Sequence, residues 1–274
     1  MIDLHIHTTA TPHHSSWAPA ALAAAAAERG LRAFAVTDHN SIASLAEAQA
    51  AAQAAGVGFV PGVEIDSGHR GKFWHMLVYG FEIGDPRINA LCESVFARNA
   101  ADAERLITTL IERGFALGGL DALGRAPHVA DVAAALARNN ELPNRDAAES
   151  DEAAAMRYIS AQVPGGYTPV GVDEVIATAH QCGAIAVLAH PGRSNGVYAR
   201  PADDGDIAAM AALGLDGLEV FYPTHSAEQR AVLAEQAWQH RLLVSGGSDS
   251  HHSHQPLAAW DEPRIAPLLD RLRV

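Results

Sequence analysis

The opening residues MIDLHIHT (residues 1–8) and the later run AFAVTDHN (residues 33–40) decide the fold class. Each begins as a short apolar stretch and ends in polar residues, and an alanine-rich segment, 19–29, lies between them. Short apolar runs that alternate with helical segments are typical of parallel βα units. The N-terminal part of the chain is therefore predicted to be strand, helix, strand.

The same alternation continues along the chain, with further helices expected at 41–55, 173–182 and 227–240. The strand candidates are 2–6, 33–37, 59–65, 74–79, 184–189, 217–221 and 242–245. Seven such strands predict an α/β fold, a distorted seven-stranded (β/α) barrel that is closed or nearly closed.

The alternation stops between residues 87 and 167. A long helix up to Arg113 is followed by a Gly-Gly pair, alanine-rich helical pieces and breakers at Pro143 and 164–166. We interpret 87–167 as an inserted helical cap over one face of a barrel formed by 1–86 and 168–274.

Composition limits the possible partners and surroundings. A chain of 274 residues, 49% hydrophobic, can bury one large core, and its net charge of −13 disfavours long nucleic acids while leaving room for a small phosphorylated ligand. No apolar run is long enough to span a bilayer, and no basic leader precedes the first strand, so a cytoplasmic protein is expected. The oligomeric state is not indicated.

The side chains at the predicted strand ends are suited to metal binding. Only Cys92 and Cys182 are present, without CxxC spacing, so any metal would be held by nitrogen and oxygen. Strand ends of a βα barrel converge on one face. The candidates there are His5, His7, Asp38, His39, Glu64, His75, His190, Asp249 and His251.

The spacing of His5 and His7 puts both rings on one face of a strand, and the pair Asp249 and His251 repeats this spacing. Alone, each pair could be an exposed pair, and His75 alone could be a packed core residue. Their coincidence at successive strand ends favours a metal site. Such a mixed set of ligands suits Mn, Zn or Fe.

Five motifs resemble those of the polymerase and histidinol phosphatase (PHP) superfamily. They are DLHIHT (3–8), VTDHN (36–40), GVEI (62–65), AHPGR (189–193) and GSDSH (247–251). With the helical insert, the chain looks closest to the branch of nucleoside 3',5'-bisphosphate phosphatases and short-RNA 5'-exonucleases. The resemblance implies a metal-dependent phosphoesterase.

The resemblance also implies ligand sets for two or three divalent ions. One would be held by His5, His7, Glu64 and Asp249, a second by Glu64, His75 and His190, and a third partly by His39 and His251, with Asp38 as a ligand or its support. Relatives complete the third site with an aspartate where this chain reads TPHHSSW (11–17). Either His14 or His13 replaces that aspartate, or the third site is weak or empty.

Four further residues are candidates for contact with substrate. Arg193, after the AHPG run, could grip a phosphate with two parallel hydrogen bonds, or be a surface residue on a turn. His225 could protonate a leaving oxygen or bind phosphate, or simply begin a helix. Arg98 and Arg105, seven residues apart on one helix, could hold a second phosphate or be solvated. The lysine that this branch carries before the fifth strand is replaced by PGGY (164–167).

These observations favour one reaction over two alternatives. The expected reaction is hydrolysis of a phosphomonoester of a small metabolite, a nucleotide such as a nucleoside 3',5'-bisphosphate or a short oligonucleotide, by a metal-activated water. Asp38, Arg193 and His225 would assist. The alternatives are amide or cyclic-phosphate hydrolysis at the same metals, and a non-catalytic metal-binding module.

Overall fold

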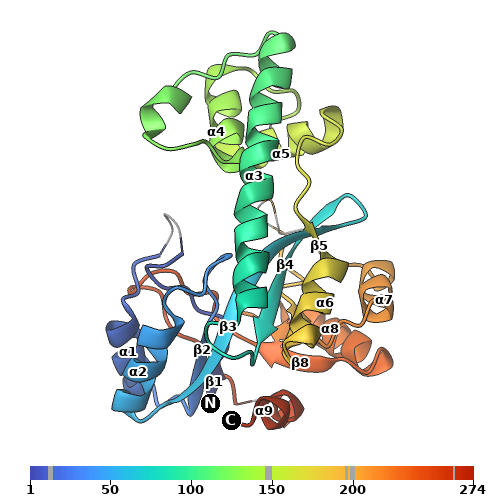
Figure 1. The fold of residues 1–274 in the computed structure, drawn as a ribbon. Coiled ribbons are helices and arrows are strands. Elements are labelled where there is room, and N and C mark those ends of the chain that lie inside the picture. The colour runs from blue at the N-terminus through green and yellow to red at the C-terminus, as the bar shows by residue number, and fades with distance from the viewer. Residues whose placement is uncertain (12–14, 146–149, 195–196, 198–200, 262) are drawn as a thin grey trace.

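A mixed β-sheet forms the centre of the molecule, and a group of helices rises from one end of it (Figure 1). The computed structural model describes residues 1–11, 15–145, 150–194, 197, 201–261 and 263–274. Within these residues the strands are β1 Ile2–Asp3, β2 Ala33–Val36, β3 Gly58–His69, β4 Lys72–Tyr79, β5 Val170–Gly171, β6 Ile185–Leu188, β7 Gly217–Phe221 and β8 Leu243–Gly246.

Helices cover the sheet and build the cap. They are α1 Pro19–Glu28, α2 Leu45–Ala55, α3 Pro86–Glu112, α4 Val129–Asn139, α5 Asp151–Gln162, α6 Val172–Gln181, α7 Asp204–Ala212, α8 Ala227–Gln239 and α9 Ala266–Leu272, with 3-10 turns at Leu120–Leu123 and Pro263–Ile265. No helix among the described residues has the length and apolar character needed to cross a membrane.

The sheet is mostly parallel, in the order β1-β2-β3-β4-β6-β7-β8, with β5 beside β3. Strand β4 is the exception, because it runs antiparallel to both β3 and β6. Arg70 and Gly71 join β3 to β4 with φ angles of 52° and 73°. Positive φ at both central residues gives a hairpin turn whose twist matches that of the strands. Sequence alone had indicated βα units here.

The predicted closed seven-stranded barrel is not confirmed, since the eight described strands form an open sheet that begins at β1 and ends at β8. Between its edges, Leu4 N donates to Gly246 O at 3.1 Å, and an isolated bridge pairs Ile6 with Ser250. The Asp3 carboxylate also accepts the amide of Ser248 at 2.9 Å. The Asp3 side chain therefore occupies the backbone N–H of Ser248, which would pair with a backbone carbonyl if the β-ladder continued from β1 to β8.

Each helix of the body buries one face in the core and leaves the other to solvent. In α1, Leu22, Ala23 and Ala26 are buried against the sheet, and α6 buries Val175 and Ile176 in the same core. Burial of a large aliphatic side chain such as Leu22 or Ile176 stabilises the fold by roughly 1.5–3 kcal/mol. Helices α1 and α2 lie on one side of the body and α6, α7 and α8 on the other (Figure 1).

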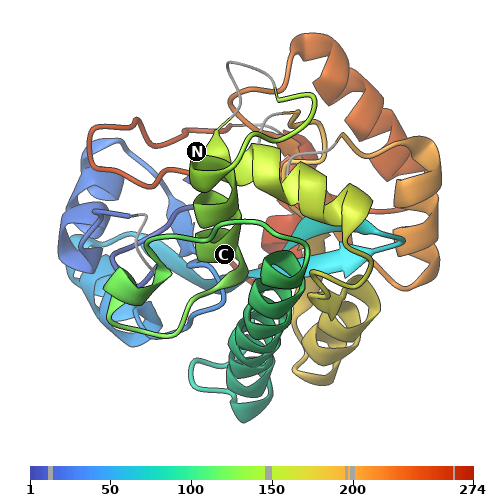
Figure 2. The same cartoon turned by 90° about the horizontal axis from the view of Figure 1, so that it is seen from above.

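Helix α3 links the body to the cap. It begins at Pro86, after Asp85, whose carboxylate accepts the amide of Arg87 at 2.8 Å. Its first half contributes Ile88 and Leu91 to the core of the body, and its second half contributes Leu106 to a separate core shared with α4 and α5. From above, the cap helices lie over the body (Figure 2). The division at residues 87 and 167 stays a prediction.

Candidate metal centre

The carboxylate of Glu64, on β3, lies at the centre of a buried cluster. Its Oε2 atom is 3.3 Å from His5 Nε2, 3.2 Å from His7 Nε2 and 3.2 Å from His39 Nδ1. Asp249 Oδ1 lies on the same side, 3.4 Å from His5 Nε2 and 3.1 Å from His7 Nε2. Four predicted ligands from distant parts of the chain, His5, His7, Glu64 and Asp249, thus converge at one point.

The second oxygen of Glu64 faces a different pair of histidines. Its Oε1 atom is 2.9 Å from His75 Nδ1 and 3.3 Å from His190 Nε2, and the two imidazole nitrogens are 3.2 Å apart. His75 stands near the start of β4, and it reaches this edge because β4 is antiparallel to β3. Glu64 is placed as a carboxylate that could bridge two cations.

The donor atoms of this cluster fit divalent cations. His5 Nε2, His39 Nδ1 and both carboxylate oxygens of Glu64 are buried and make no hydrogen bond within the described residues. Buried polar atoms without a partner are rare because desolvation is costly. Imidazole nitrogens and carboxylate oxygens are common ligands of Zn²⁺ and related ions. The described groups that could each hold one ion are His5, His7, Glu64 and Asp249; His39, Glu64 and His75; and His7, His39 and His251.

Charge within the cluster keeps its carboxylates ionised. Burial tends to raise the pKa of Glu64, but the charges of His75 and His39 hold it well below its usual range. Burial also tends to raise the pKa of Asp249, but the charge of His5 outweighs this effect and holds that pKa well below its usual range. Both groups are therefore present as the anions that bind cations.

Two candidate ligands have unusual backbone geometry, and one glycine of the site is required by a close contact. His190 and Asp249 have φ angles of +31° and +55°. Such angles in residues other than glycine store strain and concentrate at functional sites. A side chain at Gly247 would collide with His5, which explains the glycine of the GSDSH motif.

Asp38 lies outside the cluster. Its carboxylate accepts hydrogen bonds from Thr8 N, Thr8 Oγ1, Thr11 Oγ1 and Ser44 Oγ, at 2.5–2.7 Å. Thr11 Oγ1 is in turn 3.2 Å from His7 Nδ1. Of the two roles expected for Asp38, this geometry matches support of a ligand.

His251 belongs to the third group of candidate ligands, with His7 and His39. Its ring stacks on that of His7 with centroids 4.0 Å apart, and its Nδ1 is 2.9 Å from Asp249 O, which leaves Nε2 for a cation. Burial lowers the pKa of His251 to about 4. His13 and His14 lie outside the described residues.

Arg193 and His225 have different surroundings. Arg193 Nη1 is 3.3 Å from Asp249 Oδ2, at the exposed edge of the cluster. His225 is buried; its Nδ1 donates to Val220 O at 3.0 Å, and its Nε2 accepts the amide of Gly192 at 3.0 Å. Both of its nitrogens are occupied, so His225 holds the loop before Arg193 and has no lone pair or proton to offer a substrate in this arrangement.

The two cap arginines expected at a second phosphate lie elsewhere. Arg98 pairs with Glu174 of α6 at 2.8 Å, and Arg105 pairs with Asp102 one turn earlier on α3. Neither lines the cavity beside the metal centre. Helix periodicity placed them on one face, but Arg98 faces α6 and Arg105 pairs within its own helix.

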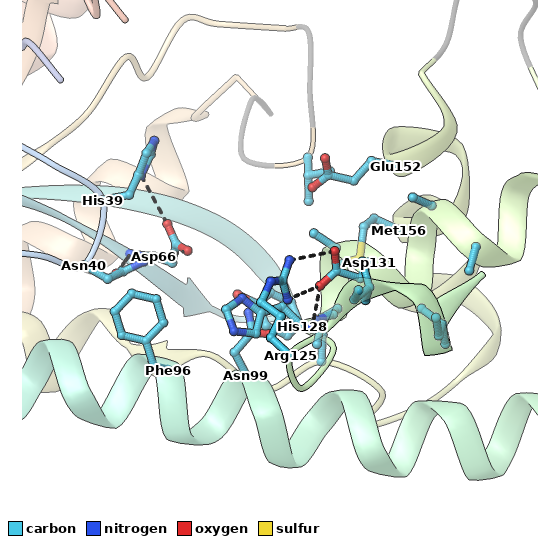
Figure 3. Close-up of a pocket in the computed structure, with 18 of the residues that line it drawn as sticks. His39, Asn40, Asp66, Phe96, Asn99, Arg125, His128, Asp131, Glu152 and Met156 are labelled. Atoms are coloured by element: carbon cyan, nitrogen blue, oxygen red, sulfur yellow. Dashed lines mark hydrogen bonds and ion pairs between the residues drawn. The ribbon is translucent and has the colours of Figure 1, made fainter. Parts of the chain in front are cut away.

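A cavity of about 510 Å³ separates the cluster from the cap. Its floor includes His39, Asp66 and His75, and its far wall includes Phe96 and Arg125. Figure 3 shows His39 and Asp66 on one side and Asp131, Glu152 and Met156 on the other. The cavity opens directly onto candidate metal ligands.

Sequence reasoning missed three carboxylates and a tyrosine. Asp66 Oδ1 is 3.2 Å from His75 Nε2, Glu219 is buried against His5, and Tyr222 donates to Asp249 Oδ2 at 2.8 Å. Asp131 pairs with Arg125 on the cavity wall. The position of Asp66 two residues after Glu64 was a usable signal, because alternate strand residues share a face.

Comparison with known proteins agrees with this geometry. The PHP domain family model matches residues 3–141. A phosphoribosyl 1,2-cyclic phosphate 1,2-diphosphodiesterase from Eggerthella lenta is 30% identical, over 91% of this chain and 93% of the relative. A 3',5'-nucleoside bisphosphate phosphatase from Chromobacterium violaceum is 27% identical, over 91% and 87%.

A solved structure from Bifidobacterium adolescentis, proposed to be a metal-dependent phosphoesterase, superposes with a TM-score of 0.70 at 26% identity, covering 98% of this chain and 96% of that one. Together with the buried cluster around Glu64, these matches define the class of the protein. The chain belongs to the PHP domain family and is a metal-dependent phosphoric ester hydrolase.

Proposed function

We propose that the protein removes a phosphate from a small phosphorylated metabolite, a nucleotide such as a nucleoside 3',5'-bisphosphate or the end of a short oligonucleotide. The observation that carries this proposal is the cavity of about 510 Å³ with candidate metal ligands in its floor. Pockets of a few hundred Å³ suit ligands of nucleotide size. The named phosphatase from Chromobacterium violaceum supports the choice of a bisphosphate.

The proposed ligand sets follow the two oxygens of Glu64. His5, His7 and Asp249 would complete one site at Oε2, and His75 and His190 a second at Oε1. A third ion would use His39 and His251. The ions would be Mn, Zn or Fe, which these nitrogen and oxygen donors accept.

When bound, such cations lower the pKa of water and offset negative charge on a phosphoryl group. Arg193 lies 3.3 Å from Asp249 and would present its guanidinium to the phosphate oxygens at the edge of the cluster. Asp38 and His225 would keep His7 and the loop of Gly192 in place. These residues orient the substrate and the ligands.

The far wall of the cavity would take the rest of the substrate. Phe96 offers an aromatic face there, and Asn99, whose Oδ1 accepts the amide of Val129 at 2.8 Å, keeps an amide NH2 group for a ligand. Arg125 lies on the same wall, held by Asp131 at 2.7 Å. An aromatic face, an amide and a guanidinium suit a nucleobase and a second anionic group.

Hydrolysis of a cyclic phosphate is the second candidate. It is favoured by the relative from Eggerthella lenta, which is named for that activity and aligns over 93% of its length. Amide hydrolysis is less favoured, because a guanidinium beside the carboxylate Asp249 matches a phosphate better than a neutral carbonyl.

The test is a substrate panel with protein loaded with Mn²⁺, Zn²⁺ or Fe²⁺. Nucleoside 3',5'-bisphosphates, simple phosphomonoesters, cyclic phosphates, short 5'-phosphorylated RNA and an amide would be compared by kcat/KM. The proposal expects the highest value for a bisphosphate, and the second candidate expects it for a cyclic phosphate. Turnover of the amide alone would overturn both.

A further inference from the structure

Glu219, in the middle of β7, is a carboxylate with no assigned task. It is fully buried, and its Oε1 is 3.0 Å from His5 Nδ1. Its Oε2 accepts the backbone amide of His190 at 2.7 Å and is 3.2 Å from His5 Nδ1. One side chain thus contacts two candidate ligands that lie on opposite oxygens of Glu64.

We propose that Glu219 is a positioning residue of the metal centre. It fixes the tautomer of His5 and the backbone of His190, so that both Nε2 atoms are available to cations. This inference rests on the ligand sets of the proposed function and adds a residue that those sets do not contain.

The tautomer of His5 follows from what each partner can do. A neutral imidazole has one N–H and one lone pair, and an ionised carboxylate only accepts hydrogen bonds. In the neutral form that binds a cation, His5 with Glu219 at Nδ1 carries its proton on Nδ1 and its lone pair on Nε2. Nε2 is the buried atom without a hydrogen bond, 3.3 Å from Glu64 and 3.4 Å from Asp249. Carboxylates that hold the second nitrogen of a histidine ligand commonly set ring orientation in this way.

The contact with His190 has a different purpose. His190 adopts a left-handed backbone with φ of +31°, which is strained for a residue with a side chain. The short bond from its amide to Glu219 stabilises this turn, and the turn directs its Nε2 toward Glu64 and His75. Glu219 therefore couples the geometry of the two halves of the centre.

The decisive variant is Glu219→Gln, which keeps the shape but has only one acceptor oxygen. His5 Nδ1–H and His190 N–H both need an acceptor, so in either orientation one of them faces the amide NH2. We expect the affinity of the metal-free protein for Zn²⁺ or Mn²⁺, measured with a competing chelator, to fall by about 10- to 100-fold.

The control is Asp102→Asn, which removes another buried carboxylate charge at the base of the cap, where Asp102 accepts from Thr168. It should bind metal like the wild type. Long-range ¹⁵N NMR of the imidazoles reports the tautomer directly: wild-type protein loaded with Zn²⁺ should show His5 protonated at Nδ1.

Glu219→Asp covers the case in which the glutamine variant does not fold. The shorter carboxylate still only accepts, so His5 should keep its Nδ1 proton even if metal binding weakens. With Zn²⁺ bound, a His5 protonated at Nε2 and not at Nδ1 in the wild type or in Glu219→Asp would overturn the inference. So would wild-type metal affinity in folded Glu219→Gln. None of these measurements uses a substrate, so failure of the substrate panel is a separate result.

Discussion

At the strand ends, the metal-competent side chains are buried and converge on one carboxylate, whereas the polar side chains of the cap are more exposed and pair with one another. Five imidazoles contact the carboxylate of Glu64, those of His5, His7, His39, His75 and His190. In the cap, Arg125 pairs with Asp131 and Arg138 with Asp151. The difference teaches that the candidate metal ligands are carried by the sheet and the turns at its strand ends, whereas the cap part of the cavity lining is carried by helices and their connections.

The comparison predicts the largest loss from removal of a central carboxylate. In Glu64→Ala or Asp249→Ala, turnover should fall to the background rate, because each change removes a charge that the cations need. Phosphate release and elemental analysis of bound metal would be measured together. The far-UV circular dichroism should remain that of the wild type.

A chelator provides the matching test on the unaltered chain. Activity should disappear on removal of metal and return with added Mn²⁺, Zn²⁺ or Fe²⁺. Full activity in metal-free protein would contradict a role for the cluster in catalysis.

A smaller effect is expected at the edge of the centre. Arg193→Ala should lower kcat/KM for the best phosphoester by roughly 10- to 150-fold, the equivalent of about 1.5–3 kcal/mol for a hydrogen bond to a charged group. Steady-state kinetics would measure this, with Arg113→Ala as the control, because Arg113 donates to Gln162 O at 2.7 Å in the cap, away from the cluster. Unchanged kinetics in Arg193→Ala would mean that the phosphate binds elsewhere.

The cavity wall should affect binding more than chemistry. Phe96→Ala should raise KM by about 2- to 12-fold, since an aromatic contact contributes roughly 0.5–1.5 kcal/mol, and leave kcat nearly constant. Nucleotides and a simple phosphomonoester would be compared. An equal rise in KM for both would show that Phe96 does not contact the base.

The smallest effect is expected at the cap arginines. Arg98→Ala and Arg105→Ala should change kcat/KM by less than about twofold, because Arg98 pairs with Glu174 and Arg105 with Asp102, away from the cavity. The Arg98–Glu174 pair is exposed, and such a pair contributes about 0.2–1 kcal/mol to stability, which thermal unfolding of Arg98→Ala would detect. A large kinetic loss would restore these residues to the substrate site.

The metal centre could be predicted because strand geometry is a short-range property. Alternation alone put His5 and His7 on one face, and the ends of successive strands supplied Glu64, His190 and Asp249. Closure of the barrel could not be predicted in this way. It depends on pairing between β1 and β8, where the Asp3 side chain takes the amide of Ser248.

The supporting residues were harder to predict for the same reason. Nothing local marks Glu219 as the partner of His5, more than 200 residues earlier in the chain, because that contact depends on the order of the strands. His225 was predicted to contact substrate or to begin a helix; it lies just before the N-cap of α8, and its hydrogen bond to Gly192 comes from a distant loop. In the cap, periodicity indicated a face for Arg98 without indicating which neighbour that face meets.

Helix α3 has 27 residues and is about 40 Å long, and it belongs to both hydrophobic cores. The number of residues in α3 therefore sets the direction in which the cap faces, because each residue adds about 100° of rotation about the helix axis. An insertion of one residue between Val95 and Asn99 would keep the same side chains in each of the two cores. It would, however, rotate the far wall of the cavity about the axis of α3. An insertion of seven residues, nearly two whole turns, would instead return the cap to almost the same orientation while moving it about 10 Å farther from the metal centre.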